Sequence, residues 1–547
     1  MMTDKAASIN VSKRQALQKM FGVGAGLMTA DLLFPKTGAA AGLGLPGGGQ
    51  MHGGAGDPST TGVFNVRAMG ATGDGKTVDT PAINKTIEAA ARAGGGTVLF
   101  PAGTYLCYSI HLRSNVALYL DRGATILAGE TGSSGHYDAA EPDPAAHHYE
   151  DYGHRHWHNA LLWGVGLENI SILGPGLIYG NGLTRGPGQK NPGVGDKTIS
   201  LKECHNVTIR DISILQGGHF GILATGIDNF TVDNIIIDTN RDGIDVDCCH
   251  NVRLSNMTVN SPWDDGICLK SSYALGYVRS TENLTASNCF VTGMYELGTV
   301  LNGTFKHFPP GERRFPTGRI KCGTESNGGF KNIAISNCVF DGCRGLALET
   351  VDGALLEDVS VSNVTMRHIA DLPIFMRLGS RMRGPQGRPI GQLRHVNISN
   401  IVVSHTSGRF CSILSGIPGH EIEDVRLSNI IILSEGGGTS EDAAIKPPEK
   451  ADGYPEPTMF GPMPAYGFFI RHVKGLQVSD VEVRTIKQDS RPAFILDDVE
   501  HADFIHIKTQ PGAGGEAFEL ENVRDFNVYL SRPVPETHLE SVTEKKL

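Results

Sequence analysis

The sequence predicts an all-β protein, a single-stranded parallel β-helix. A short pattern, Asn followed by alternating apolar residues, recurs at Asn206, Asn229, Asn251, Asn283 and Asn332. Alternation with period two is typical of strands, and the first intervals, 23 and 22 residues, are typical of stacked coils. Gly is abundant (70 residues) and aromatic residues are sparse (7%), which suits many turns around a narrow aliphatic core. A β-sandwich, with strands every ~8–12 residues, is the alternative.

Each repeat opens on a residue that favours turns. An Asn side chain bonds nearby backbone and tolerates left-handed geometry, so we expect it at a turn of each coil. Asn residues in register can also stack as a ladder. Further copies begin at Asp358, His395 and Asp424, and weaker ones near Gly475 and Asn522. The longer intervals predict coils that carry loop insertions.

The first 61 residues are expected to precede the folded domain. Residues 1–41 resemble an export signal, in which Lys13 and Arg14 precede a mildly apolar run and three alanines at 39–41 offer a cleavage site. The basic pair is similar to a twin-arginine signal with Lys in the first position; an amphipathic N-terminal tail is the alternative. Residues 42–61 are predicted to be a Gly-rich linker, and 62–547 the β-helix. We therefore expect a periplasmic or secreted bacterial protein.

The start of the β-helix is predicted to carry a capping helix. Residues 63–66 and 97–101 are predicted strands, with a tight loop over 70–75. A helix should run from Thr80 to about residue 93, with Thr80 as N-cap and Pro81 in its first turn. We expect this helix to cover the open end of the first coil, because an exposed strand edge invites aggregation.

Composition and charge exclude several partners. The net charge of −10 argues against a nucleic-acid surface. After the N-terminus no apolar stretch reaches the ~18 residues of a membrane span. None of the ten cysteines has tight paired metal spacing, and most are expected to be buried hydrophobes, with one or two disulfides as the alternative. The histidines of residues 130–160 match no tight metal site either. We expect no metal and no cofactor.

Two acidic segments carry the predicted chemistry. Asp242 lies 22 residues before Asp264 and 23 before Asp265, close to the spacing of one coil. Adjacent strands are roughly 4.8 Å apart, so the three carboxylates should lie together on one face. Such a cluster cannot ionise freely, and at least one pKa should rise. Hydrolysis of a glycosidic bond requires this combination of a protonated acid and an ionised base. Asp residues that only shape turns are the alternative.

At this point residues 62–366 resemble glycoside hydrolase family 28, the polygalacturonase family of right-handed parallel β-helices. Residues 240–249 (NRDGIDVDCC) are similar to the family's NTDG segment, and 263–271 (WDDGICLKS) to its aspartate pair, with a lysine found in its exo-acting branch. The entry region, 63–105, is typical of the family but shared with other pectin-active β-helices.

The resemblance implies inverting hydrolysis of polysaccharide or oligosaccharide substrates. Asp264 would be the general acid, and Asp242 and Asp265 would hold and deprotonate the attacking water. Inversion typically needs about 6.5–9.5 Å between acid and base, so the carboxylates should also be offset sideways. Asn240, which opens the first segment, is a further candidate contact with the substrate.

The departures from the family are equally informative. The family's Gly-His-Gly is missing, and on our alignment Gly318 stands at the histidine position, so the neighbouring Arg319-Ile320-Lys321 is not the family's Arg-Ile-Lys. That motif falls one coil later, at Ala347-Leu348-Glu349. The basic pair that meets a substrate carboxylate would then be absent. We expect Glu349 to accept hydrogen bonds from a neutral sugar and to repel a substrate carboxylate, with no cation between the two carboxylates unless Arg319 or Arg344 reaches in; a solvated edge residue is the alternative.

Other basic residues and the insertions complete the expectations. Arg319 should partly fill the place of the missing histidine. Lys270 is a candidate contact for an acidic group of the substrate, with a salt bridge to a neighbouring coil as the alternative. Insertions at 130–160 and 301–317 should wall the groove, and this favours exo action. Insertions at 377–391 and 435–465 should shield the groove, with a subunit contact as the alternative. Aromatic residues of the first insertion are expected to stack on sugars.

Three classes of function stay open. The first is an inverting glycoside hydrolase acting on pectin-type polysaccharides or fragments, and not a standard polygalacturonase. The second is a β-helical lyase or uronate epimerase, which abstracts a C5 proton and often uses Ca²⁺; the acidic cluster could bind that ion. The third is a non-catalytic glycan-binding solenoid, favoured by the loss of the family's His, Arg and Lys.

Overall fold

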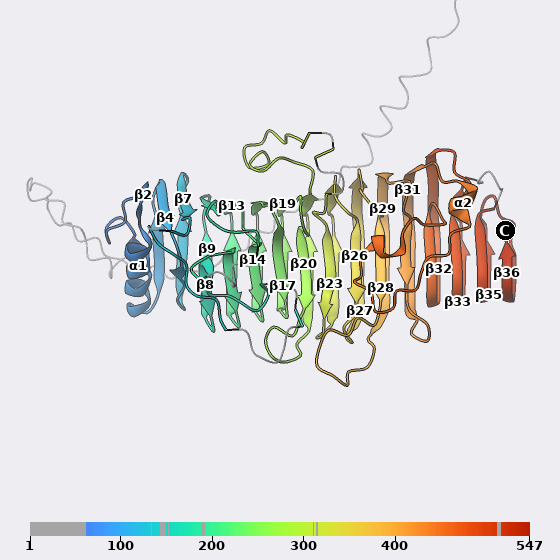
Figure 1. The fold of residues 1–547 in the computed structure, drawn as a ribbon, viewed down its shortest axis with the longest axis horizontal. Helices are drawn as coiled ribbons and strands as arrows, with labels where there is room; N and C mark the ends of the chain where they lie inside the picture. Colours follow the sequence, from blue (N-terminus) through green and yellow to red (C-terminus); the bar gives the residue numbers. More distant parts are fainter. Residues whose placement is uncertain are drawn as a thin grey trace, which may run out of the picture. The chain divides into compact units, whose positions relative to one another are not determined.

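In a computed structural model the chain forms a parallel β-helix, with one coil stacked on the next (Figure 1). The structure describes residues 62–132, 134–142, 149–150, 153–186, 192–309, 311–312, 316–510 and 516–547. The predicted signal peptide (1–41) and linker (42–61) lie outside these residues. In most coils up to residue 350 three short strands face three directions, and each pairs in parallel with its counterpart in the next coil. The predicted parallel β-helix is confirmed.

The strands form three parallel sheets. The first sheet contains β1 (Val63–Asn65), β3 (Gly96–Phe100), β6 (Val116–Leu120), β9 (Glu168–Leu173), β12 (His205–Arg210), β15 (Asp228–Asp233), β18 (His250–Ser255), β21 (Thr281–Ser287) and β24 (Phe330–Ser336). The second contains β2 (Asp74–Val78), β4 (Gly103–Cys107), β7 (Ala124–Ala128), β10 (Leu177–Tyr179), β13 (Ser213–Leu215), β16 (Ile236–Asp238), β19 (Thr258–Asn260), β22 (Phe290–Thr292) and β25 (Val339–Asp341).

The third sheet, called here the site sheet, carries the predicted catalytic residues. It contains β5 (Ile110–His111), β8 (Ala160–Val165), β11 (Lys197–Lys202), β14 (Phe220–Thr225), β17 (Asp242–Asp247), β20 (Ile267–Ser271), β23 (Ile320–Ser326), β26 (Leu346–Thr350), β28 (Ile374–Leu378) and β30 (Ser412–Ser415). Later strands are longer and span the corners between sheets: β27 (Leu355–Arg367), β29 (Gln392–Thr406), β31 (Ile422–Gly436), β32 (Phe468–Lys487), β33 (Phe494–Ile505) and β35 (Phe518–Tyr529). The short strand β34 (Lys508–Thr509) pairs with β32.

Aliphatic columns fill the interior. In the site sheet, equivalent positions of five successive coils hold isoleucine, and all five are 0% exposed: Ile199, Ile222, Ile244, Ile267 and Ile320. Burying one such side chain contributes roughly 1.5–3 kcal/mol, so register and stability come from the same residues. All ten cysteines are free and buried, as predicted for small core residues.

An asparagine ladder follows one corner of the coil. The Nδ2 of Asn229 donates to Oδ1 of Asn206 at 2.9 Å, and Asn251 donates to Asn229 at 3.3 Å. The members have left-handed backbone, with φ of 61° at Asn229, a conformation that Asn tolerates better than most residues. The ladder confirms both roles predicted for the recurring Asn. Asp358 and His395 continue the row where Asn is absent.

Both ends of the stack are covered. Helix α1 (Thr80–Arg92) buries Ile83 and Ile87 against the first coils, as predicted (Figure 1). Its N-cap position is Asp79 and not Thr80. Neither side chain caps the helix, because the Asp79 carboxylate accepts from the backbone of Thr72 and the Thr80 hydroxyl accepts from the backbone of Tyr108. At the other end β36 (Thr537–Lys546) pairs antiparallel with β35. Among the described residues no helix is long and apolar enough to cross a membrane.

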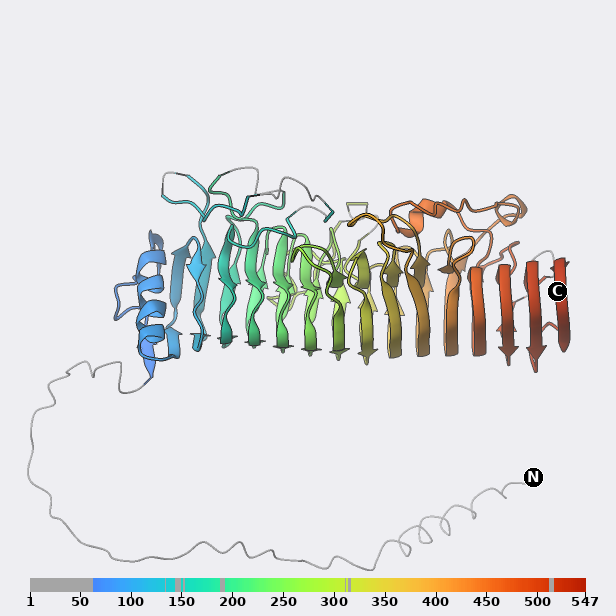
Figure 2. The same ribbon diagram turned by 90° about the horizontal axis from the view of Figure 1, so that it is seen from below.

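Two of the long insertions lie on the same side of the stack. Figure 2 shows the segment between β7 and β8 and the segment carrying α2 (Ser440–Ala443) along the same side. A short 3-10 helix, η3 (Pro457–Phe460), lies in the second of these segments. The opposite side carries only short turns, so ligand access is shaped on the side that bears the insertions.

Candidate active site

Three carboxylates meet at the start of two adjacent site-sheet strands. Asp242 begins β17, and Asp264 and Asp265 precede β20, which pairs directly with β17. Each offers an oxygen, and these oxygens lie within 4.8 Å of one another. This confirms the predicted proximity. Asp242 and Asp265 are nearly buried, at 4% and 3% exposed, whereas the Asp264 side chain is 28% exposed and faces solvent.

The surroundings push the three pKa values apart. Burial, followed by the charges of Asp264 and Asp245, raises the pKa of Asp242 well above its ordinary value. Burial and the neighbouring Asp265 raise the pKa of Asp264. Burial alone would raise the pKa of Asp265 as well, but Lys321 and Arg319 outweigh that effect and hold it far below its ordinary range. The cluster therefore contains groups that favour the protonated form beside one that is kept ionised.

Arg241 contacts the cluster directly, a role that the sequence analysis did not assign. Its Nε lies 2.9 Å from Oδ2 of Asp264 and 3.7 Å from Oδ2 of Asp242. Its Nη1 lies 2.7 Å from Nε2 of His219, and burial together with Arg241 lowers the pKa of that histidine well below its ordinary value. A neutral His219 can therefore accept from the guanidinium. The signal was available, because Arg241 stands inside the acidic segment itself.

Two buried cations hold Asp265. The Nε of Arg319 donates to Oδ1 of Asp265 at 2.8 Å, and Nζ of Lys321 lies 3.2 Å from Oδ2. The two side chains are 1% and 3% exposed. Lys321 lies in β23 and Arg319 directly precedes it; β23 pairs with β20 one coil after the acidic pair, as the alignment predicted. Arg319 lies beside the cluster as expected, but it bonds a carboxylate of the protein and is nearly inaccessible to a sugar.

Glu349 departs from its predicted role. β26 pairs Ala347 with Lys321, so Ala347 and Glu349 lie one coil further on, as predicted. A cation that the sequence analysis did not assign lies beside Glu349, because Nζ of Lys321 is 3.9 Å from its Oε2. Glu349 is 0% exposed, and neither carboxylate oxygen has a hydrogen-bond partner among the residues that the structure describes. Burial raises its pKa to about 7. A direct bond to a sugar would require the side chain to leave its buried position.

Lys270 and Asn240 complete the predicted set. Nζ of Lys270 lies 2.8 Å from Oε2 of Glu325 and 3.9 Å from Oδ2 of Asp245. This is the salt bridge to a neighbouring coil that the sequence left as the alternative, and Lys270 is only 6% exposed. Asn240 lies two residues before Asp242, and its buried Oδ1 accepts no hydrogen bond within the described part of the chain.

The first insertion covers the coils that precede the carboxylates. Nε2 of His154 lies 2.9 Å from Oδ2 of the buried Asp245, and Trp157 packs on Phe220 and Leu223. Trp157 is 3% exposed and its indole nitrogen donates to Thr225, so it packs on the sheet. The expectation that aromatic residues of this insertion stack on sugars therefore does not hold for Trp157. His147 and His148 lie outside the described residues. Trp263, next to Asp264, is partly exposed and remains the aromatic residue nearest the cluster in sequence.

The insertion at 435–465 covers the coils that follow the carboxylates. Phe460 and Met463 pack on outward-facing side chains of the site sheet, including Phe375, Ile413 and Phe469. The same insertion carries Glu456, and this carboxylate contacts Arg319, Lys321 and Arg344 beside Asp265. Sequence analysis predicted the shielding but not Glu456. Of the cations in the 301–317 insertion, Lys306 pairs with Glu296, and Arg313 and Arg314 lie outside the described residues.

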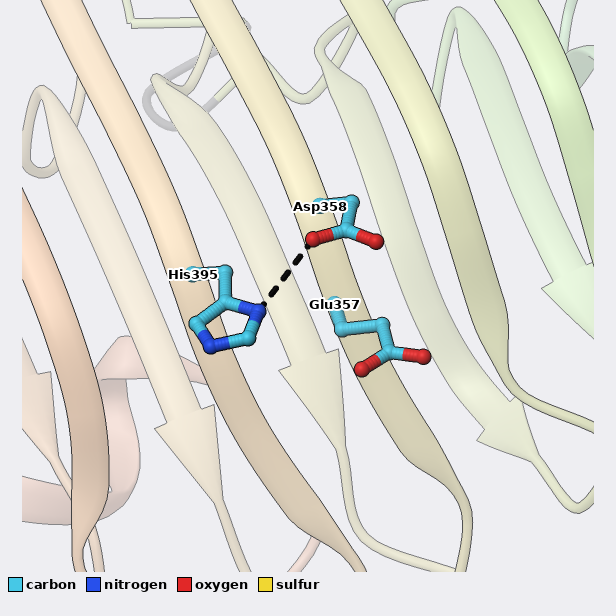
Figure 3. Close-up of side chains that lie close together, drawn as sticks. All are labelled: Glu357, Asp358 and His395. Atoms are coloured by element: carbon cyan, nitrogen blue, oxygen red, sulfur yellow. Dashed lines mark hydrogen bonds and ion pairs between the residues drawn. The ribbon is translucent and has the colours of Figure 1, made fainter.

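A second group of possible metal ligands lies away from this site. Glu357 and Asp358 on β27 and His395 on the neighbouring β29 place ligand atoms within 4.8 Å of one another (Figure 3). Nδ1 of His395 is 3.2 Å from Asp358, and Glu357 accepts from Arg394. Asp358 and His395 belong to the ladder that continues the asparagine row, and Glu357 and Arg394 are direct neighbours across the two strands, so the group needs no ion to explain its position.

Comparison with known proteins finds distant similarity to pectate lyase-like β-helices. Residues 63–295 match the model of the family described as rhamnogalacturonase A/epimerase, pectate lyase-like. A probable polygalacturonase of Vitis vinifera is 27% identical over 254 residues, 43% of this chain and 51% of that protein. The exo-poly-alpha-D-galacturonosidase of Dickeya chrysanthemi is 26% identical over 218 residues, 38% of this chain and 34% of that protein. The matched part of the chain thus spans about half or less of the length of these relatives.

Structural comparison supports the fold. The crystal structure of an exopolygalacturonase from Thermotoga maritima superimposes with a TM-score of 0.53 at 16% identity, covering 89% of this chain and 95% of that one. This agreement confirms the right-handed parallel β-helix. Shorter segments are similar to an alginate lyase and to mannuronan C5-epimerases of Azotobacter vinelandii, and to plasmin and fibronectin-binding protein A of Streptococcus pneumoniae. The chain is therefore a pectate lyase-like β-helix, distantly similar to the polygalacturonases.

Proposed function

We propose that this protein is a glycoside hydrolase that cleaves O-glycosidic bonds in pectin-type polysaccharides or their fragments. One observation carries the proposal: three adjacent carboxylates lie in surroundings that raise the pKa of two and lower the pKa of the third. Carboxylates with pKa values pushed apart are the arrangement that supplies an acid and a base at one pH. The distant similarity to polygalacturonases supports the same reaction class.

The surroundings suggest a role for each carboxylate. Asp264 is the most exposed and has a raised pKa, so it suits the general acid that protonates the leaving oxygen. Asp265 is held ionised and suits the base. Asp242 is near enough to share one water with Asp265, because two hydrogen bonds of about 2.7 Å span more than the 4.8 Å between their oxygens.

The acid–base separation decides the stereochemical outcome. One oxygen of each carboxylate lies within 4.8 Å of one oxygen of the other two, and inverting enzymes typically keep roughly 6.5–9.5 Å between the two carboxyl groups. The anomeric configuration of the first product, read by NMR during the reaction, tests the proposed roles directly: inversion supports a water held by Asp242 and Asp265, and retention would make one of them a nucleophile.

Cleavage near a chain end follows from the covered site sheet. Trp157 covers the sheet on one side of the carboxylates, and Phe460 and Met463 cover it on the other. A long polymer lying along the coils would meet both insertions. We therefore propose exo action or cleavage of short oligosaccharides. An extracellular or periplasmic site suits such substrates, and detection of the protein in a periplasmic or culture fraction tests this location.

A digest of pectic oligosaccharides separates the classes of function. The mass of the products should show a gain of one water per cleavage, and the first bonds cleaved should be those at chain ends. Chelation of divalent cations should leave the rate unchanged. The lyase or epimerase alternative draws support from the carboxylate cluster, whose spacing could hold Ca²⁺. Unsaturated products absorbing in the ultraviolet, or a calcium requirement, would favour that alternative. Binding to the same glycans without turnover would make the protein a binding solenoid.

A further inference from the structure

We propose that Glu456 sets the sugar specificity of the site: its carboxylate occupies an anion site beside the carboxylate cluster and thereby excludes the carboxylate of a uronic acid. This inference deepens the proposed function and takes from it only the class of substrate. Glu456 comes from the 435–465 insertion, far in sequence from the cluster. The sequence analysis gave the role of favouring a neutral sugar to Glu349. Because Glu349 is buried, we assign that role to Glu456 instead.

The anion site is built from three cations that converge on one carboxylate. Oε1 of Glu456 accepts from Nη2 of Arg319 at 2.7 Å and lies 3.9 Å from Nζ of Lys321. The other oxygen, Oε2, accepts from Nη1 of Arg344. Both oxygens of the carboxylate are thus engaged by separate charged donors, an arrangement that recognises carboxylates strongly.

Glu456 is a second anion for cations that also contact Asp265. Arg319 and Lys321 both contact Asp265 and are 1% and 3% exposed, so water cannot take the place of Glu456 beside their remaining positive charge. Burial alone would raise the pKa of Glu456. The surrounding cations outweigh burial and hold its pKa below the ordinary value, so Glu456 is charged at neutral pH.

The site adjoins the reacting groups. One guanidinium, that of Arg319, donates through Nε to Asp265 and through Nη2 to Glu456. The Glu456 side chain is 23% exposed and Arg344 is 21% exposed, so the anion site is open to solvent. A sugar bound against Asp264 and Asp265 would therefore present its substituents to Glu456. A neutral hydroxyl can donate to this carboxylate, whereas a second carboxylate would be repelled by it.

The insertion is held in place without Glu456. Arg471 donates to the carbonyl oxygens of Pro447 and Pro448, and Phe460 and Met463 are buried on the site sheet. Glu449, in the same insertion, makes a similar ion pair, with Oε1 3.0 Å from Nη1 of Arg471. Substitution of Glu449 is therefore a matched control for general loosening of the insertion.

The test measures binding of two monosaccharides that differ only at C6, galacturonic acid and galactose. Calorimetry or ligand-observed NMR is applied to the wild-type protein, Glu456→Gln, Glu456→Ala and the control Glu449→Gln. We expect both Glu456 variants to bind galacturonate at least tenfold more tightly than the wild type does, with galactose affinity changed less than twofold. Glu449→Gln should behave as the wild type. Adding Arg344→Ala to Glu456→Ala should abolish the gain.

The outcomes separate this inference from the proposed reaction, because binding needs no turnover. Galacturonate binding that stays unchanged in folded Glu456→Gln, a variant of nearly the same size, would overturn the inference even if the protein hydrolyses glycosides. An equal gain in Glu449→Gln would also overturn it, since loosening alone would then explain the effect. A tenfold gain confined to the Glu456 variants would support it even if no hydrolysis is found.

Discussion

Replacement of Asp264 by Asn tests the proposed general acid. The carboxamide has nearly the same size, but it cannot give a proton to the leaving oxygen. General acid catalysis by a positioned group contributes about 10²–10⁴-fold, which is about 3–6 kcal/mol of barrier. Because Asp264 is 28% exposed and contributes nothing to the core, we expect this loss in kcat with an unchanged fold.

The same substitution should change the pH profile. In the wild type Asp264 acts in its protonated form, and burial raises its pKa, so kcat/KM should fall as the pH rises through that pKa. This alkaline limb should disappear in Asp264→Asn. The charge of Asp264 also adds to burial in raising the pKa of Asp242, and in the variant the Arg241 guanidinium would keep Asp242, 3.7 Å away, as a carboxylate partner. The pKa of Asp242 should therefore move down.

The assay compares kcat and kcat/KM on the best pectic fragment over a range of pH. Asp358→Asn is the control, because Asp358 lies in the ladder row next to Asn332 and Asn fits the left-handed backbone there. That control should keep wild-type activity. An Asp264→Asn protein that keeps more than a tenth of the wild-type kcat, or keeps the alkaline limb, would refute the assignment of the acid.

Three further predictions concern stability, each measured by chemical denaturation. Arg319→Met leaves the buried Asp265 without one of its cations and should lower the free energy of unfolding by about 3–5 kcal/mol. The pKa of Asp265 is depressed in the fold, so its ion pair stabilises the protein above the ordinary pKa of Asp and is lost as the pH falls. The difference in free energy of unfolding between wild type and Arg319→Met should therefore shrink in acid; a constant difference would contradict the ion-pair account. Ile244→Ala, in the fully buried isoleucine column, should cost about 2–5 kcal/mol, and Ile244→Val about 1. Asn229→Ala should cost about 2 kcal/mol through its ladder bonds and its left-handed backbone, with Asn229→Gly less harmful; equal effects of Ala and Gly would show that the backbone conformation is unimportant.

The parts of the structure set by local repetition could be predicted from the sequence. Alternating apolar residues fix the strand faces, and the recurring Asn marks a turn of each coil. Together they give the period that brings Asp242 beside Asp264 and Asp265. These features depend only on neighbours within one coil or on the coil above, and the chain repeats them often enough for the pattern to be read.

The partners of the carboxylates could not be predicted in the same way. Arg319 meets Glu456 across 137 residues of chain, and no period relates an insertion to the coil on which it packs. The alignment with the family gives Lys321 no role at the site, because an alignment assigns positions along the chain. It does not tell that the Lys321 side chain points at Asp265, which follows from the strand on which Lys321 lies. The burial of Glu349 likewise depends on the insertion above it. Tertiary packing decided each of these points.

The covered ends of the stack should keep this protein from polymerising end to end at high concentration. A column of parallel coils has no intrinsic length: every coil offers the next one the same backbone groups, as each layer does in a fibril. Here α1 ends the column at one side and the antiparallel β36 at the other. A strand running the wrong way cannot template another coil in the same register. The molecule is therefore a finite segment of a geometry that would otherwise polymerise.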